Sequence, residues 1–243
     1  MLETKTIRCE ETVKKENALP VIIVAGGSST RMKGKNKLFA EILGIPVIVK
    51  TLLEFENSEY ISRIILVSRN CDMLKMQMLA EKYMITKLTD LTEGGSDRHN
   101  SVLNGMKRLN ENEKCVLISD GARPFVKPEM IKDCATALSD HKGCLCAVKS
   151  KDTVFKAKDG FIDEPLDRET VYLAQTPQGV DVSLYLKSSE ENKDKEFTDD
   201  ASVIAAAGEK VKIVNGSYEN IKITTIEDLI LAEAIVREEQ KCE

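Results

Sequence analysis

The sequence predicts an α/β protein in which a mostly parallel sheet is flanked by helices and carries a projecting β arm. Apolar runs suited to buried strands alternate with segments of helical periodicity through the first two-thirds of the chain. Charged or glycine-containing loops follow several of these strands, where ligands of parallel sheets bind. From Ser150 to Gln178 the alternation gives way to short β-like pieces separated by glycine and proline. This stretch predicts the β arm, over about residues 150–178.

Length and composition indicate one globular domain. The 243 residues, 42% of them apolar, suffice for a single domain at residues 19–243, preceded by an extension at residues 1–18 that we expect to be mobile. The net charge of −5 argues against a nucleic-acid-binding surface spread over the whole protein. Seven scattered cysteines without CxxC spacing predict reduced thiols in a cytoplasmic protein. No apolar run approaches the ~20 residues that span a membrane, and no secretory signal is visible.

The first half of the chain begins with the β-branched run Val21–Val24, whose continuous apolar character suits a strand buried on both faces. A turn at Gly44–Pro46 starts a helix, because apolar residues recur at helical spacing from Val47 onward. A second strand is predicted at Arg63–Ser68 and a methionine-rich helix at Met73–Met84. We expect this helix to fill the core with Leu74, Met78 and Leu79.

The middle of the chain repeats the alternation after the glycine-rich loop Gly94–Arg98. The helix that follows this loop places several small and apolar residues on one side, namely Ser101, Val102, Gly105, Met106 and Leu109. A strand at Cys115–Ser119, a helix at Pro128–Ser139 and a strand at Gly143–Val148 come next.

Beyond the predicted arm, capping signals mark two further helices. The run Thr198–Asp200 caps a short helix at Ala201–Ala207, which Gly208 ends. Short strands are predicted at Val211–Val214 and Ile221–Thr224. The run Thr224–Glu227 has the form of a capping box and opens a final helix.

The stretch from Val21 to Lys37 joins a buried strand to a small, then hydroxyl-rich, then cationic loop. Small residues at Ala25–Gly27 let a ligand approach the backbone, and the cations that follow can neutralise phosphate oxygens. The loop is not a P-loop, because Ser29 and Asn36 stand where that motif has glycine and Ser/Thr, and GxGxxG is absent. From local sequence, a phosphate site and an ordinary turn with a solvated basic face both remain open.

Asp120 ends an apolar strand, and Arg123 follows it closely. A carboxylate in this position can hold Mg²⁺, which takes one or two protein ligands, or it can cap a turn. Arg123 can clamp a phosphate or form a surface ion pair. Neither His99 nor His141 has a nucleophile context, which argues against a hydrolase triad. A basic loop with a strand-end carboxylate fits direct phosphoryl or nucleotidyl transfer, which depends on positioning and charge neutralisation.

Several sequence blocks together resemble a known family. The run Ala25–Met32 with Lys37 resembles the signature of sugar-phosphate nucleotidyltransferases. The later blocks are similar to those of the 2-C-methyl-D-erythritol 4-phosphate cytidylyltransferase family, in the same order and at similar spacings over about residues 19–237. These blocks are Gly94-Gly95-x-x-Arg98-x-x-Ser101-Val102, Asp120–Pro124, Asp167-Arg168 with Gln175–Gln178, Thr198–Ser202 and Asn220–Thr224.

The resemblance implies transfer of CMP from CTP to 2-C-methyl-D-erythritol 4-phosphate, with Mg²⁺, giving 4-diphosphocytidyl-2-C-methyl-D-erythritol and pyrophosphate in non-mevalonate isoprenoid synthesis. It implies a Rossmann-like fold of the nucleotide-diphospho-sugar transferase type and a homodimer in which the arm reaches over the partner's site. By this resemblance the catalytic residues are Arg31, Lys37 and Lys222. The nucleotide-binding residues are Ala25, Gly26, Gly27, Ser28, Gly95, Ser101, Asp120 and Gly121, with Asp120 also holding the metal. The acceptor-binding residues are Arg168, Thr176 and Thr198, together with Arg123 and Thr153, which serve the neighbouring subunit.

The first loop departs from the family pattern. Ser29 replaces a glycine, Asn36 replaces the proline before the lysine, and the loop is one residue short, so that Lys35 competes with Lys37 for the catalytic position. Two other functions stay open at this level. One is a ribitol-5-phosphate cytidylyltransferase, which would share the loop, the carboxylate and the arm. The other is a nucleotide-binding module without catalysis, although that module would not need Arg31, Lys37 and Asp120.

Overall fold

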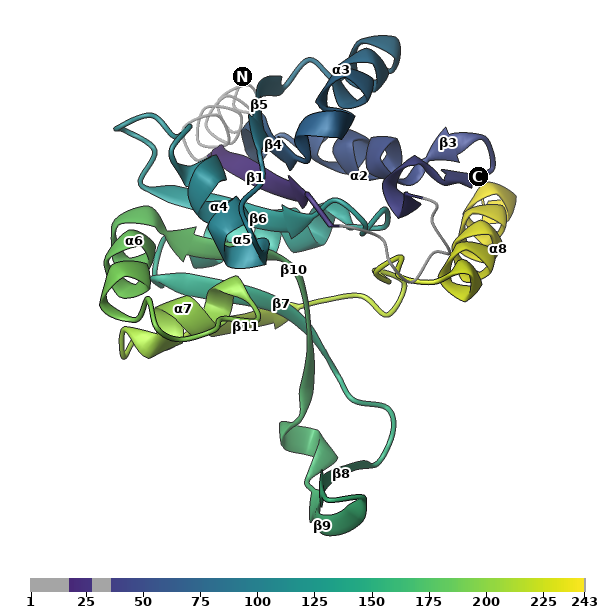
Figure 1. Cartoon of the computed structure of the whole chain (residues 1–243). Coiled ribbons are helices and arrows are strands. Elements are labelled where there is room, and N and C mark those ends of the chain that lie inside the picture. The colour runs from purple at the N-terminus through teal and green to yellow at the C-terminus, as the bar shows by residue number, and fades with distance from the viewer. Residues whose placement is uncertain (1–17, 28–35, 243) are drawn as a thin grey trace, which may run out of the picture.

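A computed structural model describes residues 18–27 and 36–242 of the chain. Its centre is a seven-stranded sheet in the order β11-β7-β10-β6-β1-β4-β5 (Figure 1). The strands are β1 (Leu19–Ala25), β4 (Ile61–Ser68), β5 (Leu88–Glu93), β6 (Cys115–Asp120), β7 (Gly143–Lys149), β10 (Tyr172–Asp181) and β11 (Lys212–Asn215). A small hairpin of β2 (Glu41–Ile42) and β3 (Ile45–Pro46) lies beside the sheet.

All neighbouring strands of the central sheet are parallel except β10, which runs antiparallel to both β6 and β7. The chain passes from β1 outward to β4 and β5, then returns to place β6 on the other side of β1. This reversal opens a crevice beyond the carboxyl ends of β1 and β6, where ligands of open α/β sheets bind. The predicted α/β class with a mostly parallel sheet and a projecting arm is confirmed.

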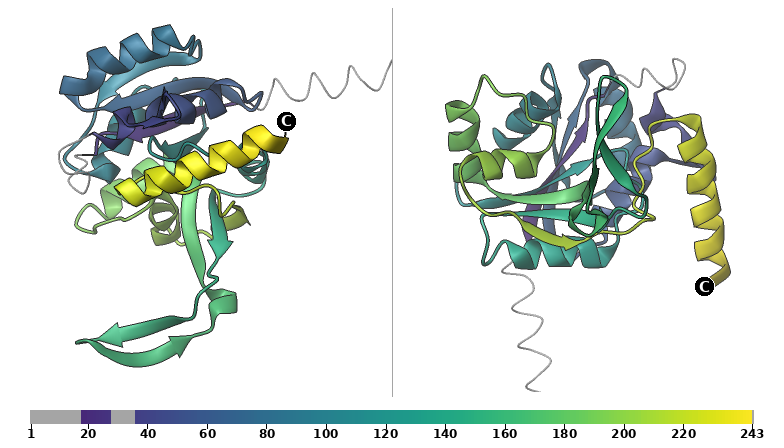
Figure 2. Two further views of the ribbon diagram at one scale, coloured as in Figure 1. Left: turned by 90° about the vertical axis from the view of Figure 1, so that its right-hand side faces the viewer. Right: turned by 90° about the horizontal axis from the view of Figure 1, so that it is seen from below.

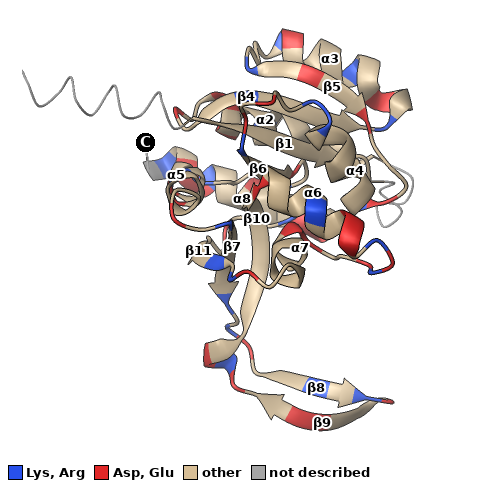
Figure 3. Ribbon diagram, turned by 90° about the vertical axis from the view of Figure 1, so that its left-hand side faces the viewer, with Lys and Arg blue, Asp and Glu red and all other residues tan. Residues whose placement is uncertain are grey.

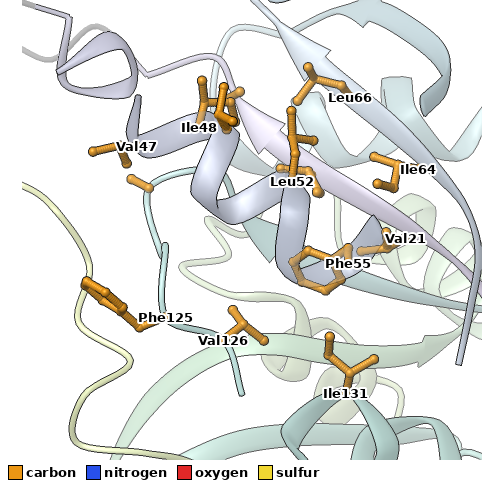
Figure 4. Packing of buried hydrophobic residues seen from close by; sticks show 14 of the residues in the cluster. Val21, Val47, Ile48, Leu52, Phe55, Ile64, Leu66, Phe125, Val126 and Ile131 are labelled. Atoms are coloured by element: carbon orange, nitrogen blue, oxygen red, sulfur yellow. The ribbon is translucent and has the colours of Figure 1, made fainter. Parts of the chain in front are cut away.

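Helices cover both faces of the sheet, and a separate apolar cluster lies under each layer. The helices are α2 (Val47–Glu56), α3 (Met73–Lys82), α4 (Arg98–Met106), α5 (Pro128–Ala137), α6 (Val182–Glu191), α7 (Asp200–Ala206) and α8 (Ile226–Cys242). On one face, Leu52 and Phe55 of α2 project toward Val21 of β1 (Figure 4). On the other face, α4, α6 and α7 pack over residues such as Ile22 and Ile118. Alternate residues of β1 therefore pack against the helices on opposite faces of the sheet, which explains the unbroken apolar sequence of this strand.

Helix α3 is found where the sequence predicts it and Leu79 packs against the core as predicted, but the other two predicted core residues do not. Leu74 and Met78 are 72% and 61% exposed, whereas Met76 is 1% exposed and packs with Ala80 against the core. Met76 and Ala80 are four residues apart and share one stripe of the helix. Because the helix carries apolar residues of its own on several sides, periodicity alone does not show which stripe is buried.

The β arm is a hairpin of β8 (Val154–Lys158) and β9 (Phe161–Leu166) that extends well away from the sheet (Figures 1 and 2). The short 3₁₀ turn η4 (Arg168–Thr170) lies near its base. The projecting part is shorter than the predicted residues 150–178. Gln175, Thr176 and Gln178 are buried in the central sheet, because β10 continues from the arm into the space between β6 and β7.

The C-terminal segment differs from its prediction in two details. Ile221–Thr224 forms no strand; instead, the amide of Ile223 donates to the carbonyl of Ala122. The capping box is shifted by one residue, because the Asp228 carboxylate accepts from the amide of Thr225 at 2.9 Å. Asp228 is the third residue of α8, the position from which an acidic side chain reaches back to the cap. Helix α8 then runs along the outside of the domain (Figure 2).

Charges of both signs are mixed over α3, α6 and the arm on the face seen in Figure 3. The absence of a nucleic-acid-binding surface spread over the whole protein stays a prediction. Within residues 18–27 and 36–242, no helix is both long and apolar enough to cross a membrane. The thiols of Cys71, Cys115, Cys134, Cys144 and Cys146 are free. A cytoplasmic location stays a prediction.

Candidate active site

A cavity of about 350 Å³ lies beyond the carboxyl ends of β1 and β6. Five separate parts of the chain line it: the loop after β1, the turn at Lys37, the start of α4 with the loop before it, the end of β6 with the loop after it, and Lys222. Most of the residues predicted to be catalytic or to bind nucleotide meet here. These are Ala25, Gly26, Gly27, Lys37, Gly95, Ser101, Asp120 and Lys222.

The loop after β1 forms one wall of the cavity. Ala25–Gly27 lies on the cavity, and a Cβ added at Gly26 would stand 3.8 Å from Ser101 Oγ. Backbone amides are thus accessible to a ligand on this wall, as small residues permit. Ser28, Arg31 and Lys35 lie outside the described residues.

Lys37 lies on the cavity at the start of the 3₁₀ turn η2 (Lys37–Phe39). Asn36 caps this turn by accepting from the amide of Leu38 at 3.1 Å. The other end of the Asn36 side chain donates to Asp72 Oδ2 at 3.1 Å, and Asp72 also accepts from Arg69 Nε at 2.7 Å. Asn36, which departs from the family pattern, therefore anchors the turn that presents Lys37.

Gly95 and Ser101 define a tight corner at the start of α4. The Ser101 hydroxyl accepts from the Gly95 amide at 3.0 Å and donates to the Asp97 carbonyl at 2.7 Å. A Cβ on Gly95 would lie 2.4 Å from the Cβ of Asn100, so no side chain fits there without displacing the helix. Asp97 caps α4 by accepting from the amide of Asn100. The corner keeps the backbone close to the cavity, as the predicted contact with a nucleoside requires.

Asp120 is the electrostatic centre of the site. Its Oδ2 lies 2.7 Å from Lys222 Nζ and 3.8 Å from Arg123 Nε, and its Oδ1 lies 3.2 Å from Arg98 Nε. Burial by itself would raise the pKa of Asp120, but Arg98 and Lys222, helped by Arg123, outweigh burial and hold the pKa well below its usual value. The carboxylate is therefore ionised near neutral pH.

A second set of hydrogen bonds fixes the backbone at Asp120. The Thr176 hydroxyl accepts from the Asp120 amide at 3.1 Å and lies 3.0 Å from Ser119 Oγ. Asn220 Nδ2 donates to the Thr176 carbonyl at 2.8 Å, and Arg123 Nη1 donates to the Asn220 carbonyl at 2.6 Å. Thr176 and Arg123 therefore bind the backbone of their own chain next to Asp120.

Gly121 was predicted among the nucleotide-binding residues, and it lies behind the cavity wall. Its amide donates to the Val24 carbonyl at 2.8 Å. A Cβ there would lie 3.0 Å from Ile48 Cδ1 and 3.2 Å from the Val24 carbonyl oxygen. The glycine lets the loop after β6 pack closely against β1 and α2.

None of the five residues predicted to bind the acceptor lines this cavity; Arg123 and Thr176 bind the backbone as described above. Thr153 and Arg168 are exposed on the arm side of the molecule, where the Arg168 side chain is 59% exposed. Thr198 lies instead on a second, more open cavity of about 870 Å³ between α4, α6 and the loop before α7.

Two charged side chains of the site carried no predicted role. Arg98 lines the cavity and bridges Asp120 and Asp200; its Nη2 lies 2.6 Å from Asp200 Oδ2. Both residues belong to quoted sequence blocks, but Asp200 reads locally as a helix cap, and nothing in the sequence predicts that these two blocks meet. Arg98 and Asp200 are 102 positions apart in the sequence and come into contact only in the folded chain.

The side chains around the cavity suit a metal ion that takes most of its ligands from water and substrate rather than from the protein. Within the described part of the chain, no group of three or more His, Cys, Asp or Glu side chains is placed to hold a metal ion. Asp120 offers one carboxylate at the cavity. Its Oδ2 already binds one cation, the ammonium of Lys222. Mg²⁺ fits such a site, because it commonly takes one or two carboxylates together with water and substrate phosphates.

Comparison with known sequences places this geometry in context. A model of the 2-C-methyl-D-erythritol 4-phosphate cytidylyltransferase family matches residues 19–238. The protein of that name from Geobacillus kaustophilus is 41% identical over 218 residues, which cover 88% of this chain and 95% of the relative. The one from Bacillus mycoides is 41% identical over 224 residues, which cover 91% and 99%.

Solved structures agree with the sequence matches. The structure of 4-diphosphocytidyl-2C-methyl-D-erythritol synthase from Anaerococcus prevotii superimposes with a TM-score of 0.82 at 35% identity and covers 93% of this chain and 99% of that one. The structure of 2-C-methyl-D-erythritol 4-phosphate cytidylyltransferase from Thermus thermophilus gives a TM-score of 0.74 at 26% identity, with 90% and 99% coverage.

Proposed function

The chain belongs to the 2-C-methyl-D-erythritol 4-phosphate cytidylyltransferase family, and we propose that its cavity transfers CMP from CTP to 2-C-methyl-D-erythritol 4-phosphate. The products are 4-diphosphocytidyl-2-C-methyl-D-erythritol and pyrophosphate, an intermediate and a by-product of non-mevalonate isoprenoid synthesis. The observation that carries the proposal is the meeting of glycine-rich backbone, lysines and one ionised carboxylate around a single cavity.

The reaction is an in-line displacement at the α-phosphorus of CTP. A phosphate oxygen of the acceptor forms the new P–O bond as the bond to the pyrophosphate oxygen breaks, so no covalent protein intermediate is needed. The backbone of Ala25–Gly27 supports binding of the triphosphate, and the corner at Gly95 and Ser101 supports binding of the nucleoside. Lys37 and Lys222 stand where ammonium groups can stabilise the negative charge of the transition state and the leaving group.

We infer that Asp120 holds Mg²⁺ on the nucleotide. The bound metal supplies charge neutralisation at the triphosphate oxygens. Asp120 would hold the metal, and Lys222, whose ammonium lies 2.7 Å from Asp120 Oδ2, would be close enough to bind a substrate phosphate there. The positive side chains around Asp120 also compensate its charge before substrate binds.

The experiment measures pyrophosphate release by the purified chain with CTP, comparing 2-C-methyl-D-erythritol 4-phosphate with ribitol 5-phosphate as acceptors, each with and without Mg²⁺. We expect release with the methylerythritol phosphate and Mg²⁺ only. Release with ribitol phosphate alone would instead assign the chain to the other acceptor. CTP binding without release with either acceptor would indicate a nucleotide-binding module. Turnover that persists with excess chelator would contradict the metal assignment.

The arm supports a homodimer. Its hairpin presents apolar side chains to solvent in the single chain; Phe161 and Ile162 are 77% and 67% exposed. Large exposed apolar patches of this kind mark interaction surfaces. Thr153 and Arg168 lie on this side of the molecule, away from the cavity of their own chain. A partner's arm would bring such residues to the acceptor end of the site.

We expect sedimentation equilibrium of the intact protein to give about twice the 27.0 kDa chain mass. A Phe161→Glu variant should shift the equilibrium toward monomer and lose turnover in proportion, because it places a charge in the apolar contact. Lys158→Glu, on the same hairpin, serves as a control for a change of charge. A monomeric protein with full activity would contradict a shared site.

A further inference from the structure

A series of buried and half-buried polar groups leads from the cavity into the layer formed by α4, α6 and α7. Arg98 Nε lies 3.2 Å from Asp120 Oδ1, and Arg98 Nη2 lies 2.6 Å from Asp200 Oδ2. The Tyr185 hydroxyl donates to Asp200 Oδ1 at 3.0 Å, and His99 Nδ1 lies 3.1 Å from that hydroxyl. We call these five residues the relay.

The inner members of the relay are enclosed by apolar side chains. Tyr185 has no exposed surface and packs in the cluster that includes Val102 and Val203, and Asp200 is 1% exposed. Burying a hydroxyl and a carboxylate in such surroundings is costly unless every polar atom is satisfied. Both oxygens of Asp200 accept a hydrogen bond, and its amide donates to Gln178 Oε1 at 2.9 Å. Asp200 therefore has a single orientation.

The direction of each hydrogen bond follows from the chemistry of the groups. An ionised carboxylate only accepts, so the single hydrogen of the Tyr185 hydroxyl is committed to Asp200. His99 must therefore donate from Nδ1, which fixes its tautomer. Burial lowers the pKa of His99, despite the nearby Asp200, and burial together with Asp200 raises the pKa of Tyr185. His99 is thus neutral and Tyr185 protonated near neutral pH, as this arrangement requires.

Arg98 connects the relay to the cavity. Burial lowers its pKa, but Asp200 and Asp120 outweigh burial, so the pKa is raised and the guanidinium stays charged. Within this planar group, Nη2 binds Asp200 and the neighbouring Nε binds Asp120. Because the guanidinium is rigid, fixing the position of Nη2 also orients Nε.

We propose that Asp200, Tyr185 and His99 are positioning residues, which hold Arg98 so that it fixes Oδ1 of Asp120 and leaves Oδ2 for Lys222 and the metal-bound nucleotide. The proposal rests on the proposed function for the role of Asp120. It adds residues of α4, α6 and α7 that lie outside the cavity at Asp120 but determine the carboxylate rotamer on which binding depends. Misplacement of a binding group by about 1 Å can lower a rate by up to ~10²-fold.

The first test reads Arg98 directly in the protein without substrate. Nitrogen-15 NMR of arginine side chains follows the Nε–H signal of Arg98, assigned by its loss in Arg98→Lys. We expect a slowly exchanging signal in the wild type and a shifted, fast-exchanging or absent signal in Tyr185→Phe, which removes only the hydroxyl. Ser188→Ala is the matched control, because it removes a buried hydroxyl from the same helix whose partner is the Val203 carbonyl. This control should leave the Arg98 signal unchanged.

The second test measures pyrophosphate release. Tyr185→Phe should lower kcat about tenfold, whereas Ser188→Ala should stay within about twofold of wild type at a similar loss of melting temperature. Asp200→Asn, which preserves shape and removes the charge that holds Arg98, should lower kcat at least as much as Tyr185→Phe. Because the relay acts through Arg98, Tyr185→Phe should add less than about twofold in an Arg98→Lys background.

The outcomes separate the relay from the proposed function. An unchanged Arg98 signal in both Tyr185→Phe and Asp200→Asn overturns the relay, whatever the activity. Equal losses of kcat in Tyr185→Phe and Ser188→Ala, or losses that multiply in the Arg98→Lys background, also overturn it, because they indicate general destabilisation. A wild-type protein that releases no pyrophosphate refutes the proposed function, while the NMR result still decides whether the relay orders Arg98.

Discussion

Replacing Asp120 with asparagine should lower kcat by about a thousandfold, the largest effect we expect from any single substitution in this protein. The amide keeps the size of the side chain and an oxygen that can face Arg98, but it removes the negative charge. Arg98, Lys222 and Arg123 then lie around this position without the anion that they share. The metal-bound nucleotide loses its protein carboxylate, and repulsion from the cations adds to that loss.

The measurement is pyrophosphate release over a range of Mg²⁺ concentrations, with thermal unfolding of the same samples. Asp181→Asn is the control, because Asp181 also has a lowered pKa, which its bonds to Lys142 and the Leu184 amide produce against the effect of burial. It caps α6 outside the cavity. We expect the control to lose some stability and retain its turnover. Retention of more than about a tenth of wild-type kcat by Asp120→Asn would refute the central role of this carboxylate.

Replacing Lys37 with alanine should lower kcat by at least a hundredfold, whereas Lys35→Ala should change it only a few-fold. Lys37 lies on the cavity, at the start of η2, where its ammonium can stabilise charge that develops on the triphosphate. The turn itself is held by the Asn36 side chain and by Asp72, neither of which the substitution removes. The loss should therefore reflect the missing charge rather than a rearranged loop.

Steady-state kinetics at saturating acceptor separate kcat from the KM for CTP in both lysine variants. A group that acts mainly in the transition state lowers kcat and kcat/KM together. We expect this pattern for Lys37→Ala. If Lys35→Ala gives the larger loss, the shortened loop presents the other lysine, and the assignment based on resemblance is shifted by two residues.

Much of the fold follows from pattern alone, and particular elements show why. The continuous apolar run of β1 and the alternation of strand and helix predict a buried parallel sheet, because only helix-covered strands are apolar on both faces. Where a pattern is ambiguous, the prediction is less exact. The methionine-rich helix α3 is in the right place but presents Leu74 and Met78 to solvent, since its apolar residues do not form one narrow stripe. The arm is predicted, yet its last residues belong to the sheet, because pairing partners for β10 come from distant strands.

The sequence by itself determined the α/β class, the glycine-rich and cationic loop, the strand-end carboxylate and, through blocks in register, the family. These features are local, because backbone freedom, strand periodicity and residue type are properties of a few adjacent residues. The tertiary structure alone decided how Asp120 is surrounded. Arg98, Lys222 and Asp200 come from three distant parts of the chain, and a carboxylate's charge state and orientation depend on which groups lie within a few ångströms of it. Sequence spacing does not encode such contacts. They arise because the fold brings these parts of the chain together beside β1 and β6.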